Sequence, residues 1–155
     1  MKLTIGHLYP DLLNLYGDRG NIQCMMKRLQ WRGIEAKTIE FEIQDEVDFS
    51  ELDIVLLGGG SDREQMLVCE RLKEIRDDFK AYVEDGGVVL AVCGGYQLLG
   101  THYSTDQGVI EGLSIVDIYT EQGKDYRLID NIVLESELSD MPDRKSTRLN
   151  SSHRC

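Results

Sequence analysis

The cysteine at position 93 is the residue of this sequence whose setting most favours nucleophilic chemistry. It follows the apolar run 88–92 and is followed at once by two glycines, Gly94 and Gly95. A strand that turns sharply into a helix at such a position projects its nucleophile above the sheet, an arrangement known as a nucleophile elbow. Small residues flank the nucleophile because the turn brings backbone segments together. Here they are Ala91 and Gly95, with alanine where glycine is more usual. The pattern predicts that Cys93 is a catalytic nucleophile.

The same turn predicts groups that would stabilise negative charge. The N–H groups at the start of a helix favour a thiolate over a thiol. We expect the Gly94 N–H to donate to the oxyanion that forms during attack on an acyl carbon. The triple glycine 58–60 follows another apolar run. Gly59 is the best candidate for a second donor, because glycine lets the backbone approach a substrate closely. Gly59 and Gly94 therefore form the predicted oxyanion hole.

The alternative for Cys93 is that it is a small buried residue of the core, which is the commonest fate of a free cysteine. The elbow glycines and the triple glycine favour the nucleophile. Cys24 and Cys69 lie within helical patterns and are predicted to be packing residues, and Cys155 belongs to an unusual tail. The spacing of the cysteines fits neither a zinc site nor a disulfide framework.

The elements that must carry these residues alternate between strands and helices. A helix is expected between Asn21, as its N-cap, and Gly33, and one or two helices are expected within 62–84. Alternation of this kind predicts an α/β fold, a three-layer αβα open parallel sheet. The nearly all-apolar runs 53–58 and 88–92 are typical of strands buried on both faces. Ligands bind such sheets at the C-terminal ends of the strands, where both glycine clusters fall. The expected strands are residues 2–8, 34–41, 53–58 and 88–92, with looser candidates at 112–119 and 128–135.

Length and charge narrow the class of protein. The chain of 155 residues is long enough for one domain with a hydrophobic core. Its net charge of −11 argues against binding to nucleic acid or to an anionic membrane surface. No apolar run approaches the roughly 20 residues that span a bilayer. The N-terminus leads straight into a predicted strand rather than a signal peptide, so a cytoplasmic protein is expected.

Residues 143–155 differ in composition from the rest of the chain. They hold four of the 17 basic residues but only one of the 28 acidic residues. The run 143–153 also looks like the translation of a common sequencing-adapter DNA, the alternative being a genuine polar tail. We expect that residues 1–142 form the domain, that residues 143–155 are a non-native tail, and that the native protein continues past Pro142.

The elbow at Cys93 and the N-terminal signature 8–21 resemble known enzymes. The signature reads Leu-Tyr-Pro-Asp-Leu-Leu-Asn-Leu-Tyr-Gly-Asp-Arg-Gly-Asn. Together they resemble the class I glutamine amidotransferases of the cobyric-acid-synthase-like branch, and the signature is similar to that of the GatD-type glutaminase subunits of lipid II isoglutaminyl synthases. The resemblance covers residues 1–142. It implies a flavodoxin-like class I glutamine amidotransferase fold, incomplete at the C-terminus.

The resemblance implies a reaction and a partner. Cys93 would attack the side-chain amide of L-glutamine, ammonia would leave, and water would hydrolyse the thioester to give glutamate. A MurT-type ATP-dependent ligase would use the ammonia to convert the D-glutamate of lipid II to D-isoglutamine in peptidoglycan synthesis. ATP and Mg²⁺ are expected on that ligase, and neither a cofactor nor a metal is expected in this subunit.

Two residues are expected to bind the substrate, and the resemblance assigns the first of them. Arg127 matches the family arginine that is expected to hold the glutamine, and a guanidinium donates two parallel hydrogen bonds to a carboxylate. The alternative for Arg127 is a solvated surface charge. Gln97, one turn after the elbow, is expected to contact the same substrate.

The family's catalytic histidine lies well downstream of the elbow, and none of the three histidines here matches it. His7 ends the first predicted strand and is expected to be packed or on the surface. His102 follows the elbow helix too closely to face Cys93, and His153 lies in the tail. We therefore expect that the catalytic histidine is missing from this sequence, and that the 155-residue chain alone has little or no glutaminase activity.

Two other functions stay open. An amidotransferase of the same fold would act on cobyric acid or another carboxylate, and a ligase domain fused to the same gene would favour it. A non-catalytic flavodoxin-like binding module would be favoured by a buried and unreactive Cys93. The polar loop 11–20 lies near the predicted strand ends, where it would line the active site or contact the ligase.

Overall fold

The central feature of the fold is a parallel sheet of four strands. The computed structural model describes residues 2–15, 18–105, 108–122, 128–136, 139–149 and 151–154. Neighbouring strands of this sheet pair in parallel in the order β2-β1-β3-β4, so their C-terminal ends lie at one edge. The strands are β1 (Lys2–Leu8), β2 (Glu35–Phe41), β3 (Ile54–Leu57) and β4 (Val88–Ala91). Each lies within a predicted strand, so these four predictions are confirmed.

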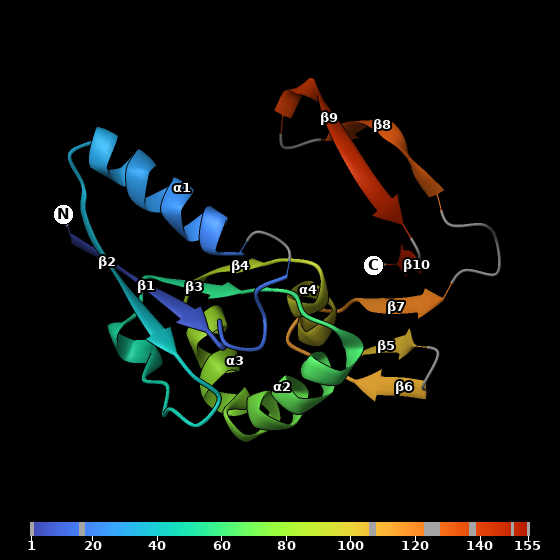
Figure 1. The fold of residues 1–155 in the computed structure, drawn as a ribbon, viewed down its shortest axis with the longest axis horizontal. Coiled ribbons are helices and arrows are strands. Elements are labelled where there is room, and N and C mark those ends of the chain that lie inside the picture. Colours follow the sequence, from blue (N-terminus) through green and yellow to red (C-terminus); the bar gives the residue numbers. More distant parts are fainter. Residues whose placement is uncertain are drawn as a thin grey trace.

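Helices cover both faces of the sheet, as predicted for a three-layer αβα fold. Helix α1 (Asp18–Trp31) lies on one face, and α2 (Asp62–Glu74) and α3 (Arg76–Glu84) lie on the other (Figure 1). The predicted helical stretch 62–84 is thus two helices, which meet at Ile75. The α/β fold class expected from the sequence is confirmed.

The ends of α1 are set by two residues with different roles. The helix begins at Asp18, three residues before Asn21, so the predicted N-cap at Asn21 is wrong. The early start follows from the Asp18 carboxylate, which is buried against the loop after β3 and accepts a hydrogen bond from the Gly59 N–H. Gly33 follows the end of the helix as predicted, with a φ of 67° that glycine adopts without strain.

The hydrophobic core lies between the sheet and the layer formed by α2 and α3. Phe49, in the short 3₁₀ helix η1 (Phe49–Glu51), stacks on Phe79 with ring centroids 5.0 Å apart. Full burial of such side chains stabilises the fold by about 1.5–3 kcal/mol each. The fully buried apolar residues of this core include Leu8, Val55, Leu57, Val68, Leu72 and Phe79.

Strand β4 is exposed on one face, so the expectation that residues 88–92 are buried on both faces is wrong. Val88 and Leu90 are 55% and 38% exposed, whereas Val89 and Ala91 alternate with them and pack against the core. The reason is position: β4 is an edge strand of the four-stranded sheet, and α1 packs over β2 at the opposite edge.

A second sheet follows the short helix α4 (Gly94–Leu99). The predicted strand 112–119 is wrong, because only its last residue belongs to a strand. Residues 112–118 instead form a loop. In this loop the Leu113 N–H donates to the Leu98 carbonyl at 2.8 Å, which satisfies an acceptor at the end of α4. The second sheet contains β5 (His102–Thr105), β6 (Gly108–Glu111), β7 (Tyr119–Gln122) and β10 (Ser151–Arg154).

Two further strands form an antiparallel pair. They are β8 (Leu128–Ser136) and β9 (Ser139–Leu149). Strand β8 contains the whole of the predicted strand 128–135, so that prediction is confirmed.

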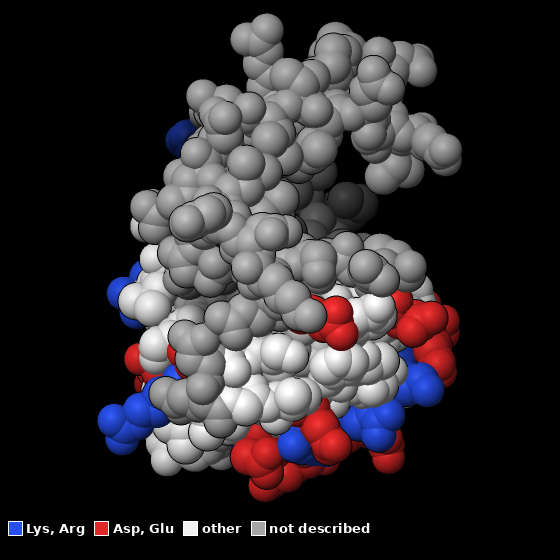
Figure 2. Space-filling view, turned by 90° about the vertical axis from the view of Figure 1, so that its right-hand side faces the viewer, with Lys and Arg blue, Asp and Glu red and all other residues white. Residues whose placement is uncertain are grey.

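The helices of the described residues differ in length and hydropathy from a helix that spans a membrane. In the part of the chain that the structure describes, no helix is both long and apolar enough to cross a bilayer. On the face drawn in Figure 2, acidic and basic side chains lie around an area that carries no charge.

Candidate functional site

The predicted elbow at Cys93 is present. Cys93 follows β4 after a single residue and is the N-cap of α4, with a backbone φ of 53° and ψ of −114°. This left-handed conformation costs a residue other than glycine about 1–3 kcal/mol. The side chain is exposed, so Cys93 is not the buried packing residue that was its alternative. A strained, exposed thiol at the end of a strand is the geometry that a nucleophile elbow provides.

Backbone contacts hold the elbow against the neighbouring strand. The Val92 N–H donates to the Leu57 carbonyl at 2.9 Å, and the Gly95 N–H donates to the Val92 carbonyl at 3.0 Å. A Cβ on Gly95 would lie 2.5 Å from the carbonyl oxygens of both Leu57 and Gly58. Backbone atoms cannot yield as a flexible side chain can, so only glycine fits there. This explains the small residue that the sequence pattern required two positions after Cys93.

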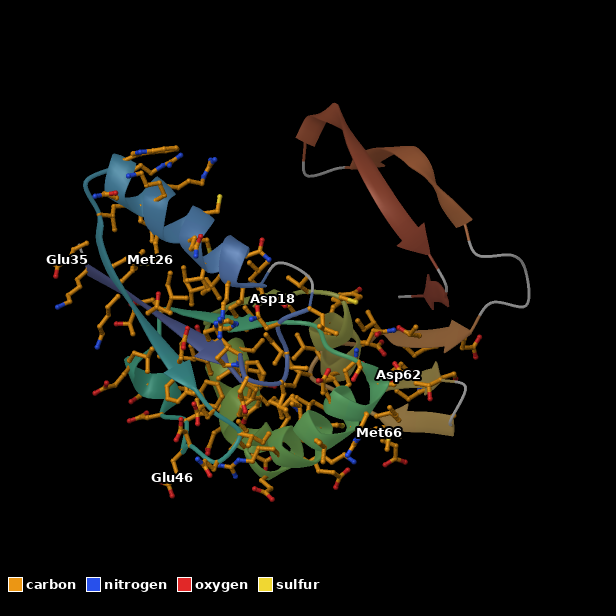
Figure 3. The ribbon with its side chains drawn as sticks, in the orientation of Figure 1. Asp18, Met26, Glu35, Glu46, Asp62 and Met66 are labelled. Atoms are coloured by element: carbon orange, nitrogen blue, oxygen red, sulfur yellow. The ribbon has the colours of Figure 1, made fainter. Side chains whose placement is uncertain are left out.

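The triple glycine follows β3, next to the elbow at the same edge of the sheet. All three glycines are buried, and a Cβ on Gly58 would lie 2.6 Å from the Asp18 carboxyl carbon. The N–H of Gly59, the predicted second oxyanion donor, points to Asp18 Oδ2 at a long 3.4 Å. Figure 3 shows Asp18 at the start of α1, over the end of the sheet. The structure thus brings the Gly59 and Gly94 segments together, and it adds a carboxylate beside Gly59.

A buried histidine lies close to that carboxylate. His7 is the second-last residue of β1 and has no exposed surface, and neither ring nitrogen has a hydrogen-bond partner among the described residues. Burial lowers the pKa of His7 below 6.5, and the negative charges of Glu40 and Asp18 offset part of that shift. A neutral imidazole enclosed in this way is a packed residue, which confirms one of the two sequence-based expectations for His7.

Two buried polar residues of this region, Asp18 and Gln65, were not singled out in the sequence. Gln65 is 3% exposed and lies on α2, where its side chain donates to the Gly60 carbonyl at 2.8 Å. A signal for Asp18 was its position in the polar loop 11–20, near the strand ends. No local signal marked Gln65, which lies in a helix of mixed charge.

The structure describes one of the two predicted substrate-binding residues. Gln97 is half-buried on α4, and its backbone N–H donates to the Cys93 carbonyl at 3.2 Å. It therefore lies one turn from the thiol, as the sequence predicted. Arg127 lies outside the described residues, so its role stays a prediction.

The other histidines belong to the second sheet. The ring of His102 stacks on Tyr119 with centroids 5.3 Å apart, and its Nδ1 lies 3.2 Å from Thr101 Oγ1. These contacts hold His102 on β5, consistent with the expectation that it does not serve Cys93. The backbone of His153 lies in β10.

The remaining cysteines differ from each other in burial. Cys69 is 1% exposed, and burial raises the pKa of its thiol, which confirms its prediction as a packing residue. Cys24 is exposed on α1, so the prediction that it packs in the interior is wrong. Within the described ranges, no group of His, Cys, Asp and Glu side chains is arranged to hold a metal ion.

Comparison with known proteins identifies the family to which this geometry corresponds. Residues 4–151 match the family described as CobB/CobQ-like glutamine amidotransferase domain. The GatD subunit of the glutamine-hydrolysing lipid II isoglutaminyl synthase of Staphylococcus aureus strain N315 is 45% identical over 137 residues, which are 88% of this chain and 56% of that subunit. The chain thus spans about half the length of this curated relative.

Two more distant similarities are also informative. Cobyric acid synthase of Clostridium kluyveri is 32% identical over 84 residues, which are 50% of this chain and 17% of that enzyme. The crystal structure of a protein assigned as a peptidase E from Listeria monocytogenes EGD-e has a TM-score of 0.51 at 14% identity, and the match covers 74% of this chain and 63% of that one. At that identity the structural likeness supports the fold alone.

Proposed function

This chain belongs to the CobB/CobQ-like glutamine amidotransferase family, and from that membership we propose that it carries the nucleophile of a glutaminase subunit, Cys93. The observation that supports the proposal most strongly is that Cys93 is both exposed and strained in its backbone, at the end of β4 next to the strand that leads into the triple glycine. A module that only binds a partner has no need of backbone strain at an exposed cysteine.

In the proposed reaction the Cys93 thiolate attacks the side-chain amide carbon of L-glutamine. A carbon–sulfur bond forms, and the carbonyl oxygen becomes an oxyanion that the N–H groups of Gly59 and Gly94 stabilise. For this, the Gly59 N–H exchanges its long hydrogen bond to Asp18 Oδ2 for one to the oxyanion. The carbon–nitrogen bond then breaks, and the nitrogen leaves as ammonia after it receives a proton. Water hydrolyses the thioester and releases glutamate, which restores the thiol.

Two residues would bind this substrate. We propose that Gln97 contacts the bound glutamine, since it lies one turn after Cys93, and that Arg127 binds the glutamine α-carboxylate. Proton transfer to and from the sulfur and the leaving nitrogen requires a general base. The ring of His7 is enclosed with no exposed surface, and the ring of His102 stacks on Tyr119 in the second sheet, so we assign this role to neither.

The relatives suggest where the ammonia goes. The match to the GatD subunit covers most of this chain, whereas the match to cobyric acid synthase covers half of it at lower identity. We therefore propose that the ammonia passes to a MurT-type ATP-dependent ligase, which amidates the D-glutamate of lipid II in peptidoglycan synthesis. ATP and Mg²⁺ would bind to that ligase, in the cytoplasm. Amidation of cobyric acid is the less supported alternative.

Glutamate release by the full-length gene product, assayed with its ligase partner, tests the proposal. Cys93→Ser should reduce kcat by at least about 1,000-fold, because the hydroxyl replaces the nucleophilic thiol. Cys24→Ser is the matched control, since Cys24 is also exposed but lies on α1, and it should leave kcat within about twofold of wild type. Glutamate release that survives Cys93→Ser would contradict the proposal. Amidation of cobyric acid instead of lipid II would support the alternative acceptor.

A further inference from the structure

A buried amide side chain connects the two segments that carry the proposed oxyanion donors. Gln65 lies on α2, and its Nε2 donates a hydrogen bond to the Gly60 carbonyl at 2.8 Å. That carbonyl belongs to the triple glycine, one residue after the Gly59 amide. The Gln65 side chain is therefore fastened to the first of the two segments.

The same amide group packs against the second segment. A Cβ on Gly94 would overlap the amide carbon and nitrogen of Gln65 and would lie 2.9 Å from its Oε1. The Gln65 amide thus occupies the space in which a side chain of the residue after Cys93 would stand. One planar group touches both the triple glycine and the elbow.

The helix that carries Gln65 is firmly anchored at this end. Ser61 caps α2, with its hydroxyl accepting from the Glu64 N–H and the Glu64 carboxylate accepting from the Ser61 N–H. The Gln65 N–H donates to the Ser61 carbonyl at 2.8 Å, and Val68 and Leu72 on the same helix are fully buried. A side chain that projects from such a fixed backbone can hold two loops at a set separation.

Packing alone does not explain a glutamine at this place. Its Oε1 is buried without a hydrogen-bond partner among the described residues, and an unpaired buried acceptor is unfavourable. An apolar side chain of equal length would fill the same volume without that cost. What glutamine adds is the N–H that fixes the Gly60 carbonyl.

We propose that Gln65 is a positioning residue that sets the separation of the Gly59 and Gly94 amides, an inference that rests on the proposed glutaminase function. Oxyanion stabilisation depends on donors that are held in place before the reaction begins. If the triple glycine drifts away from the elbow, the oxyanion loses part of its stabilisation although the thiol is unchanged. Loss of Gln65 should therefore lower kcat more than it raises KM.

The test compares Gln65→Met and Gln65→Asn with wild type in the full-length gene product. Methionine keeps the length but cannot donate, and asparagine keeps the amide but is one methylene too short to reach both segments. Each should lower kcat for glutamine hydrolysis by about 10- to 100-fold and leave KM within about twofold. Alkylation of Cys93 by iodoacetamide should proceed at the wild-type rate, because that reaction needs no oxyanion hole.

Val68→Ala is the matched control on the same helix. Val68 is also fully buried, but the hydrogen bond to Gly60 and the close approach to Gly94 are made by Gln65 and not by Val68. Truncation of Val68 should therefore lower the melting temperature and leave kcat within about twofold. A Gln65→Met protein with wild-type kcat would overturn the inference, and so would a loss that appears only in KM. A wild-type protein without glutaminase activity would overturn the proposed function itself, whereas an active wild type with an unimpaired Gln65→Met would overturn only this inference.

Discussion

The backbone strain at Cys93 is a property of one residue, and it can be measured without any substrate. With φ at 53° and ψ at −114°, the position suits glycine better than any residue with a Cβ. We predict that Cys93→Gly has a free energy of unfolding about 1 kcal/mol higher than Cys93→Ala, because both lack the thiol but only alanine keeps the strain. Urea denaturation of the two variants measures the difference. A glycine variant less stable than the alanine variant would show that the elbow is not strained.

The enclosed imidazole of His7 predicts how stability depends on pH. Burial lowers the pKa of His7 in the folded chain, so the unfolded chain, in which histidine titrates near 6.5, binds the proton first as the pH falls. This contribution to stability is present above pH 6.5 and is lost as the pH drops below it. Nearby Glu40 and Asp18 reduce the effect but do not reverse it.

His7→Phe should therefore lose less stability on acidification than wild type. The measurement is the free energy of unfolding of both proteins from pH 7.5 down to about pH 5, where His7 protonation in the unfolded chain is well advanced. Carboxylates that protonate in the same range affect both proteins alike. Parallel curves for the two proteins would mean that His7 is not enclosed as a neutral ring.

Among the residues of the candidate site, those in local motifs could be predicted from the sequence, whereas those defined by contacts between distant segments could not. The elbow of Cys93 and Gly95 was predictable because strand, nucleophile and glycine are adjacent in the chain. Asp18 was missed because its partner, Gly59, is 41 residues away. Gln65 was missed for a related reason: a glutamine in a mixed-charge helix gives no sign that it will be buried against two glycine segments.

The junction between β4 and α4 is an element whose geometry depends on one glycine. A Cβ on Gly95 would collide with the carbonyl oxygens of Leu57 and Gly58 at the end of β3. Gly95→Ala should lower the free energy of unfolding by about 1–3 kcal/mol, since the two strand ends must move apart. Thermal or urea unfolding measures the change.

Gly20 provides the matched control for that substitution. It lies within α1, and a Cβ there would have no neighbour within 4 Å. Gly20→Ala should raise the free energy of unfolding by about 0.5–1 kcal/mol, because alanine restricts the unfolded chain and favours helix. Equal effects of the two alanines would contradict the close packing of β4, α4 and β3.

The positions of the strands could be predicted from the sequence where a clear hydrophobic pattern marks them. Strands β3 and β4 were predictable from short apolar runs that end in turn residues. The exposure of Val88 and Leu90 was not, because an apolar run does not reveal that its strand lies at the edge of a sheet. The strand predicted at 112–119 is wrong because most of this segment is a loop that satisfies backbone groups at the end of α4. No local sequence pattern reveals such a contact.

At the scale of the whole molecule, the layers place both glycine clusters at one edge of the sheet. Strands β3 and β4 are neighbours and parallel, so the triple glycine and the elbow emerge side by side from their C-terminal ends. The fold class was predictable from the alternation of elements alone. The acceptor of the proposed ammonia was not predictable from the sheet, since it would be set by the proposed ligase partner and not by these strands.

Active-site labelling tests most directly whether Cys93 is a nucleophile for glutamine. The full-length gene product is treated with 6-diazo-5-oxo-L-norleucine, a reactive glutamine analogue, and the adduct is located by peptide mass spectrometry. We expect one adduct on Cys93, suppressed by excess L-glutamine, and none on Cys24, which is also exposed. Absence of an adduct on Cys93, or equal labelling of both cysteines without protection by glutamine, would contradict the role of Cys93 as nucleophile.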